Sequence, residues 1–262
     1  MPKVSVIMST YNNANFLPKA IKSVLLQSFF DFEFIIINDN STDNTEDTIK
    51  NFSDERIVYL KNEENKGLIF NLNKGLEIAR GEYIARIDSD DCWSDKDKLQ
   101  KQVNFLEQNP DFALVGTWAQ VYDKDGIKKY QIKYFSDFDQ IKKKILFKNC
   151  FVHSSVVFRK NCAKECGGYN VEEKYIEDYG LWLRMGEKYK LGNIAEICAD
   201  YLHNESGETQ KNNLQQIKNI FVLIKKHKNF YPYYFWAEIR WMIKYLIVLF
   251  GGLKMINKLK SI

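Results

Sequence analysis

The sequence lacks the features that mark several common functional classes. No long basic stripe interleaved with aromatic residues occurs in its first two hundred residues, and the formal net charge is only +4. Because nucleic-acid affinity depends largely on neutralising phosphates with lysine and arginine, nucleic acid is not expected to be the main partner. The hydrophobic content of 45% and charged content of 27% indicate a folded protein with a full core.

A zinc-ligand pattern and a signal peptide are also missing. The five cysteines are odd in number, and no second cysteine or histidine pair complements Cys162 and Cys166. Free thiols in a reducing compartment are therefore expected. The N-terminus enters a strand pattern directly, without the apolar stretch and cleavage site of a signal peptide. We expect a cytoplasmic protein.

No apolar run is long enough to cross a bilayer. The longest charge-free run near the C-terminus, residues 245–253, is less than half of the roughly 20 residues required. Residues 230–250 hold nine aromatic side chains, with basic residues around them: Arg240, Lys244, Lys254, Lys258 and Lys260. An amphipathic helix of this composition suits a membrane interface, which predicts peripheral contact with the inner face of the cell membrane. The alternative is a C-terminal helix that packs its apolar face on the domain.

The first hundred residues alternate between strand and helix patterns. Strands are predicted at residues 4–8, 33–37, 56–60 and 83–87, and helices at 16–27, from Asp43 onward with Glu46 as a capping-box partner, and at 68–79. This alternation indicates βαβ units and a mostly parallel α/β sheet flanked by helices on both faces. Past residue 95 the pattern loosens into a mixed α+β extension. We expect a first half at 1–95, a second half of the same domain at 96–210 and a C-terminal helical segment at 211–262.

Polar segments follow each of the four predicted strands of the first half. They are residues 9–13, 38–41, 62–67 and 88–91. Because open α/β sheets bind ligands at the carboxyl ends of their strands, these segments should converge on one rim.

The last of these segments, Asp88-Ser89-Asp90-Asp91, carries three carboxylates in four residues. Clustered carboxylates repel one another unless a cation or a hydrogen-bond network offsets the repulsion. Mg²⁺ and Mn²⁺ take oxygen ligands and use few protein carboxylates, so a divalent metal site is predicted here. The alternative is an acidic turn that caps the following helix.

Together these motifs resemble glycosyltransferase family two, whose catalytic domain has the Rossmann-like GT-A fold. The resemblance runs from about residue 4 to about 206 and rests on motifs in order: VSVIMSTYN at 4–12, IIINDNSTD at 35–43, NKG at 65–67 with Asn71 and Gly75, GEYI at 81–84, DSDD at 88–91, and ED at 177–178 with Trp182, Arg184 and His203. Any one motif is weak, whereas the ordered set is highly specific.

The resemblance implies a nucleotide-sugar pocket and a metal site. The residues implied in nucleotide-sugar binding are Thr10, Tyr11, Asn13, Asp39, Asn65 and Asp88. A divalent Mn²⁺ or Mg²⁺ ion would be held by Asp90, Asp91 and His203. For Asp39 the alternative is a turn residue that bonds to its own backbone, and for His203 it is a structural histidine.

The resemblance also implies a catalytic base. Asp178 would take the proton from the acceptor hydroxyl as it attacks the anomeric carbon, with inversion. Glu177, Trp182 and Arg184 would bind the acceptor or support the base. The alternative for the two acids is stabilisation by a helix N-terminus.

The sequence departs from the family pattern at several positions. Asn38 and Asn40 replace the usual acid and glycine, which puts the nucleotide identity in doubt. No arginine lies two residues before His203, and His153-Ser154-Ser155 stands where relatives often have His-Pro-Ser.

The function implied is inverting transfer from a nucleotide-diphospho-sugar, expected to be a UDP-sugar, to a hydroxyl of a glycan acceptor. A lipid-linked acceptor in lipopolysaccharide, capsule or O-antigen synthesis is consistent with the membrane contact predicted for the C-terminal segment. A sugar nucleotidyltransferase would need a glycine-rich, basic loop after the first strand, and residues 9–13 contain neither glycine nor lysine. An inactive sugar-nucleotide-binding protein is the remaining alternative.

Overall fold

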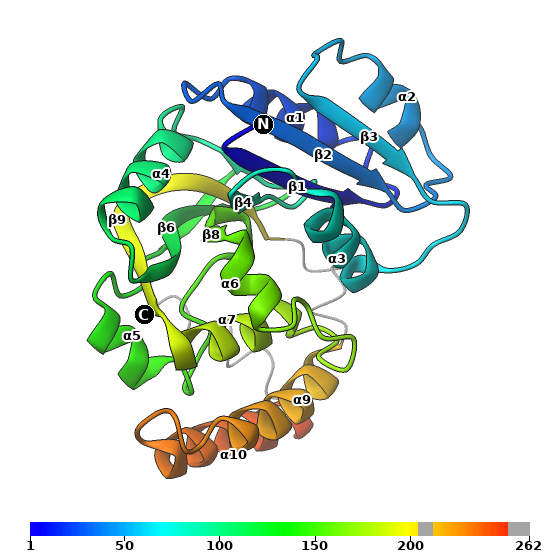
Figure 1. Cartoon of the computed structure of the whole chain (residues 1–262). Coiled ribbons are helices and arrows are strands. Elements are labelled where there is room, and N and C mark those ends of the chain that lie inside the picture. The colour runs from blue at the N-terminus through cyan, green and yellow to red at the C-terminus, as the bar shows by residue number, and fades with distance from the viewer. Residues whose placement is uncertain (204–211, 251–262) are drawn as a thin grey trace.

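The computed structural model describes residues 1–203 and 212–250 (Figure 1). In this part of the chain nine strands form one sheet, in the order β3-β2-β1-β4-β8-β6-β9-β5, with β7 paired to β6. Part of the predicted C-terminal segment, including Lys254, Lys258 and Lys260, lies outside the described residues, as do residues 204–206 of the resemblance.

The first half forms the predicted parallel unit. Its elements are β1 (Val4–Thr10), α1 (Leu17–Leu25), β2 (Phe32–Asn38), α2 (Thr45–Lys50), β3 (Ile57–Lys61), α3 (Leu68–Ile78) and β4 (Tyr83–Arg86). β1 is central and pairs in parallel with β2 and β4, and β2 pairs in parallel with β3. All four strands therefore end at the same rim.

The second half extends the same sheet with mixed strand directions. Its elements are β5 (Cys92–Trp93), α4 (Lys98–Gln108), β6 (Phe112–Tyr122), β7 (Lys128–Ile132), α5 (Phe138–Lys144), the 3-10 turn η1 (His153–Ser155), β8 (Val157–Arg159), α6 (Lys160–Glu165), α7 (Glu177–Lys188) and β9 (Lys190–Leu202). β8 runs antiparallel between β4 and β6, whereas β9 runs parallel to β6. The mixed α+β extension is confirmed.

Alternation along β1 explains the two apolar layers. Val4, Val6 and Met8 face one side, where α1, α2 and α4 pack, whereas Ile7 faces the side covered by α3 and α7. Successive side chains of a strand point to opposite faces, so a strand buried on both sides needs apolar residues at nearly every position.

A buried polar network fastens the three central strands at the end opposite the rim. The Ser5 hydroxyl donates to Glu33 Oε1 at 2.6 Å and accepts a 2.8 Å hydrogen bond from Gly81 N. The Glu33 carboxylate also accepts from Arg80 N and Nε. Gly81 is required here because a Cβ would lie 2.5 Å from the backbone nitrogen of Ser5.

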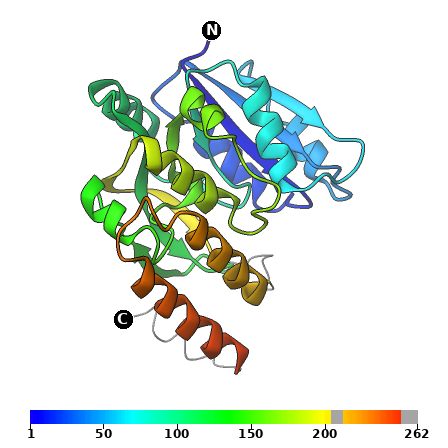
Figure 2. The same cartoon turned by 60° about the horizontal axis from the view of Figure 1, so that its bottom comes forward.

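The two C-terminal helices, α9 (Asn213–Lys226) and α10 (Tyr234–Leu249), lie side by side beyond α5 and α7, away from β1–β3 (Figures 1 and 2). Trp241 anchors α10 because its indole Nε1 donates to Leu146 O at 2.9 Å. No helix among the described residues combines the length and apolar character that crossing a membrane requires.

Several predicted boundaries differ from the structure. The helix predicted from Asp43 begins at Thr45, and Glu46 forms ion pairs with Lys50 and Lys61 instead of closing a capping box. The strands predicted at 4–8 and 56–60 extend over Val4–Thr10 and Ile57–Lys61. The contact of Glu46 with Lys61, 15 residues away, depends on tertiary structure that local patterns do not contain.

Candidate active site

Hydrogen bonds between loops confirm that the four polar segments meet at the rim. Asn13 Nδ2 donates to Ser89 Oγ at 2.8 Å, which joins the loop after β1 to the acidic segment after β4. Asn12 Oδ1 accepts from Thr42 N at 2.7 Å, which joins the loops after β1 and β2. The expected convergence therefore holds for backbone segments up to 76 residues apart.

Asp39 organises the loop between β3 and α3. Its Oδ1 accepts from Asn62 Nδ2 at 2.7 Å and Lys66 N at 2.8 Å, and its Oδ2 accepts from Gly67 N at 2.9 Å. Asp39 is 2% exposed. A carboxylate has about four lone-pair sites, so three of them are used by this loop and one is left for a ligand.

The other predicted nucleotide-binding residues surround Asp39. Thr10 is buried, and its carbonyl accepts a 2.9 Å hydrogen bond from Asp39 N. The Thr10 hydroxyl has no hydrogen-bond partner among the described residues. Tyr11 is 49% exposed, and Asn65 is exposed on the loop that Asp39 holds. A buried, unpartnered hydroxyl at a loop rim is a group that a ligand can satisfy.

Arg86 lies under the acidic segment and was not singled out from the sequence. It is 1% exposed, yet its guanidinium is charged. The guanidinium donates to Asp88 Oδ1 and to the carbonyls of Ile7 and Ile87, and its Nε has no partner among the described residues. An arginine in a strand of this kind usually points to solvent, so the pattern gave no sign of this buried cation.

Asp88 and Asp91 are held by Ser154. The Ser154 hydroxyl donates to Asp91 Oδ2, lies 3.1 Å from Asp88 Oδ2, and accepts from Asp88 N at 2.9 Å. Asp91 Oδ1 accepts from Leu202 N at 2.8 Å. Asp91 thus uses two of its about four lone-pair sites within the protein, and the end of β9 is fixed beside it.

Asp90 is the member of the segment best placed to bind a cation. Its carboxylate makes no hydrogen bond or ion pair with another described residue. His203 follows Leu202 directly and donates its backbone N–H to Tyr122 O at 2.8 Å, so it lies close in the chain to the residue that contacts Asp91.

The pKa values report the repulsion within this cluster. Burial, followed by the charge of Asp88, raises the pKa of Asp90 to about 6. Burial and the charges of Asp90 and Asp88 raise the pKa of Asp91 well above its usual range. Burial alone would raise the pKa of Asp88, but Arg86, His153 and Ser154 hold that pKa below its usual value. The carboxylate oxygens of Asp90 and Asp91, whose raised pKa values reflect negative charge without a paired cation, are donors that fit Mn²⁺ or Mg²⁺.

Asp178 faces the same site from the first turn of α7. Its Oδ2 accepts from Asn149 Nδ2 at 2.7 Å, and its Oδ1 accepts from Tyr179 N at 2.6 Å. Burial raises its pKa to about 6 against these hydrogen bonds, and the charge of Asp88 adds to the increase. Burial and then the charge of Asp178 raise the pKa of Glu177 to about 8. A carboxylate with a pKa near 6 is a competent general base at neutral pH.

The remaining predicted acceptor residues support the site from behind. Trp182 is fully buried and packs edge-on against His153, with ring centroids 6.3 Å apart. Arg184 donates to Glu173 Oε1 and Oε2, both at 2.7 Å, and to two carbonyls. His153 is kept neutral because burial and then Arg86 lower its pKa to about 3.

A second group of potential metal ligands lies elsewhere, formed by Asp95, Glu196 and Cys198. Lys101 Nζ lies 2.6 Å from Asp95 Oδ2 and 2.5 Å from Glu196 Oε2, so one lysine already pairs with both carboxylates and offsets part of their charge. The acidic segment at the rim stays the predicted metal site.

A parallel α/β unit with an acidic segment at a strand end, and a half-buried carboxylate whose pKa responds to that segment, is the arrangement of a glycosyltransferase of the GT-A class. Solved structures of this class share the fold. The mannosyltransferase from Pyrobaculum calidifontis in complex with GDP-Man and Mn²⁺ gives a TM-score of 0.69 at 16% identity, covering 99% of this chain and 79% of that chain. TarS of S. aureus in complex with UDP gives 0.66 at 19% identity, covering 85% of this chain and 65% of that one.

The sequence comparisons define the family. The model of Glycosyl transferase family 2 matches residues 5–165, and the chain belongs to that family. An uncharacterized glycosyltransferase of Methanocaldococcus jannaschii is 33% identical over 238 residues, which are 87% of this chain and 80% of the relative. A UDP-Glc:alpha-D-GlcNAc-diphosphoundecaprenol beta-1,3-glucosyltransferase of Escherichia coli is 31% identical over 219 residues, 83% of each chain. The chain is a glycosyltransferase, so the nucleotidyltransferase alternative is set aside.

Proposed function

We propose that this enzyme transfers a sugar, with inversion, from a UDP-sugar to a hydroxyl of a lipid-linked glycan during cell-surface polysaccharide assembly. The half-buried Asp178 carboxylate, whose pKa is raised by burial and by the charge of Asp88, carries the proposal. The names of two Escherichia coli relatives support the donor and acceptor, since both are UDP-Glc glucosyltransferases acting on a diphosphoundecaprenol-linked sugar. The reaction would take place at the cytoplasmic face of the cell membrane.

The donor would bind across the rim. Asp39, with Thr10, Tyr11, Asn13 and Asn65 around it, would contact the nucleoside, and Asp88 would contact the ribose or hold the loop. Asp90, with Asp91 and His203, would hold Mn²⁺ or Mg²⁺. When bound, the ion supplies Lewis-acid stabilisation of the leaving diphosphate.

Asp178 would accept the proton of the acceptor hydroxyl as its oxygen bonds to the anomeric carbon and the bond to the nucleotide diphosphate breaks. Asn149 and the backbone N–H of Tyr179 fix the orientation of this carboxylate. Glu177, next to it, would bind the acceptor or orient the loop. Trp182 and Arg184 would maintain the shape of the acceptor side.

The test is a screen of sugar donors, followed by activity and affinity measurements on a variant of Asp178. UDP-, GDP- and dTDP-sugars are compared by thermal shift and by nucleotide release, with Mn²⁺ and with chelator. Asp178→Asn should lower transfer at least about 100-fold while nucleotide affinity changes little, because a general base contributes roughly 10²–10⁴-fold. Transfer by the variant at the wild-type rate would refute the assignment, and absence of transfer by the wild type with every donor would favour an inactive binding protein.

A further inference from the structure

Helix α10 has two apolar faces, of which one is unpartnered within the described residues. Ala237, Trp241 and Val248 are buried on the domain side. Eight other apolar side chains of the helix and its C-cap are at least 36% exposed: Phe235, Trp236, Ile239, Met242, Ile243, Leu246, Leu249 and Phe250. At 100° per residue these eight fall within an arc of about 140°, opposite the buried face. A contiguous exposed apolar surface of this kind marks an interaction site.

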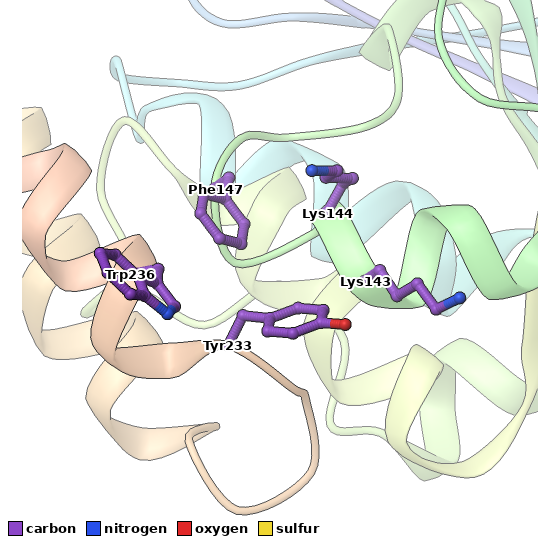
Figure 3. Close-up of a pocket in the computed structure, with 5 residues that line it drawn as sticks. All are labelled: Lys143, Lys144, Phe147, Tyr233 and Trp236. Carbon is purple, nitrogen blue, oxygen red and sulfur yellow. The ribbon is translucent and has the colours of Figure 1, made fainter.

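Lysines border one end of this surface. Lys143 and Lys144, both exposed in the last turn of α5, have no carboxylate partner among the described residues. Together with Phe147, Tyr233 and Trp236 they line an open pocket of about 420 Å³ (Figure 3). Trp236 belongs both to this pocket and to the apolar arc of α10, so the cationic and apolar surfaces are continuous.

We propose that this combined surface docks on a bilayer that contains anionic lipids. The apolar arc would enter the boundary between headgroups and acyl chains, with α10 lying in the plane of the membrane. Lys143 and Lys144 would bind a lipid phosphate, and Tyr233 and Trp236 would lie at headgroup level, where amphipathic rings are favoured. A second copy of the chain explains the lysines less well, because like charges would meet across such an interface.

The chain links this surface directly to the catalytic carboxylate. Phe147 lines the pocket, and Asn149, two residues further on, donates to Asp178. Two residues span at most about 7 Å, so the pocket opens close to the acceptor side of the site. Arg240 Nε, 3.3 Å from Phe147 O, ties α10 to the same turn. The inference rests on the proposed function for its purpose: a docked enzyme would present Asp178 to a membrane-bound acceptor.

Vesicle sedimentation of the full chain tests the docking. Vesicles of phosphatidylcholine alone are compared with vesicles containing about 30% phosphatidylglycerol, whose surface potential attracts basic groups. Wild type should bind the anionic vesicles at least about tenfold more tightly. Lys143→Glu/Lys144→Glu should remove that preference, and Trp236→Glu/Ile243→Glu should weaken binding to both vesicle types. The matched control Lys22→Glu/Leu26→Glu, exposed on α1, should bind as wild type does.

Either of two outcomes would overturn the docking proposal. One is equal binding of wild type and both test variants to anionic vesicles. The other is a dimer in light scattering that dissociates in Trp236→Glu/Ile243→Glu while no vesicle binding occurs. Nucleotide release from the donor without acceptor should be unchanged in all variants. Because that assay needs no membrane, failure of docking and failure of the proposed transfer activity are told apart.

Discussion

At the scale of single residues, the buried Arg86 dominates the electrostatics of the site. It pairs with Asp88, two residues further along the chain, and it adds to burial in lowering the pKa of His153, which is 67 residues away. This cation thus favours the ionised form of one acid and the neutral form of one imidazole.

Arg86→Met should destabilise the protein by about 1–3 kcal/mol, because the change leaves the half-buried Asp88 carboxylate without its cation. Urea denaturation measures the loss. Lys74→Met removes an exposed pair with Glu77 and should cost at most about 1 kcal/mol. If the two variants lose equal stability, Arg86 does not have this role.

Asn149→Ala should shift the acid limb of the pH profile of kcat/KM to higher pH. Asn149 donates to the ionised form of Asp178, so its loss raises the pKa of the base from about 6 by about one unit. A smaller fraction of the base is then ionised at a given pH, so the variant is less active than wild type at pH values below 7. Asn109→Ala, which removes an amide hydrogen bond to Phe105 O, serves as the control and should leave the limb in place. A uniform loss of rate with an unshifted limb would contradict the positioning role.

At the scale of elements, the first half could be predicted because its information is local. Apolar runs, turn residues and helical spacing define β1 through β4, and the polar segments at their ends follow directly. β8, in contrast, has three residues and is placed between β4 and β6 by partners more than 40 residues away. The contacts of Ser154 with Asp91 and of Asn149 with Asp178 could not be predicted for the same reason, since they join residues 63 and 29 positions apart. Arg86 is only two residues from Asp88, but the strand pattern does not show that its side chain is buried.

The loop between β3 and α3 offers a test with a matched control. Gly67 and Gly126 have φ of 84° and 76°, and a Cβ at either would meet nothing within 4 Å. Gly67→Ala and Gly126→Ala should each cost about 1–2 kcal/mol from backbone strain. Only Gly67→Ala should weaken nucleotide binding, since Gly67 N is held by Asp39. Calorimetry with UDP measures the affinities. Equal affinities in the two variants would show that this loop does not contribute to nucleotide binding.

At the scale of the whole molecule, stability should depend jointly on pH and Mn²⁺. Asp90 and Asp91 have raised pKa values, and they must lose protons to bind a cation. The Tm increase caused by Mn²⁺ should therefore be small below about pH 6 and grow toward about pH 8. Comparing the increase at each pH cancels the contribution of Lys98, whose pKa burial lowers to about 7 and which titrates with or without the ion. Asp90→Asn should abolish most of the increase, and an increase that is independent of pH would argue against carboxylate ligation.

The network of Ser5, Glu33, Arg80 and Gly81 has a consequence for how this enzyme can change. It fixes the central strands relative to one another at the end of the sheet opposite the rim. The loops at the opposite end are then free to vary in sequence without loss of strand register. Laboratory evolution toward a new donor should accumulate substitutions in those loops, while these four positions should tolerate almost none.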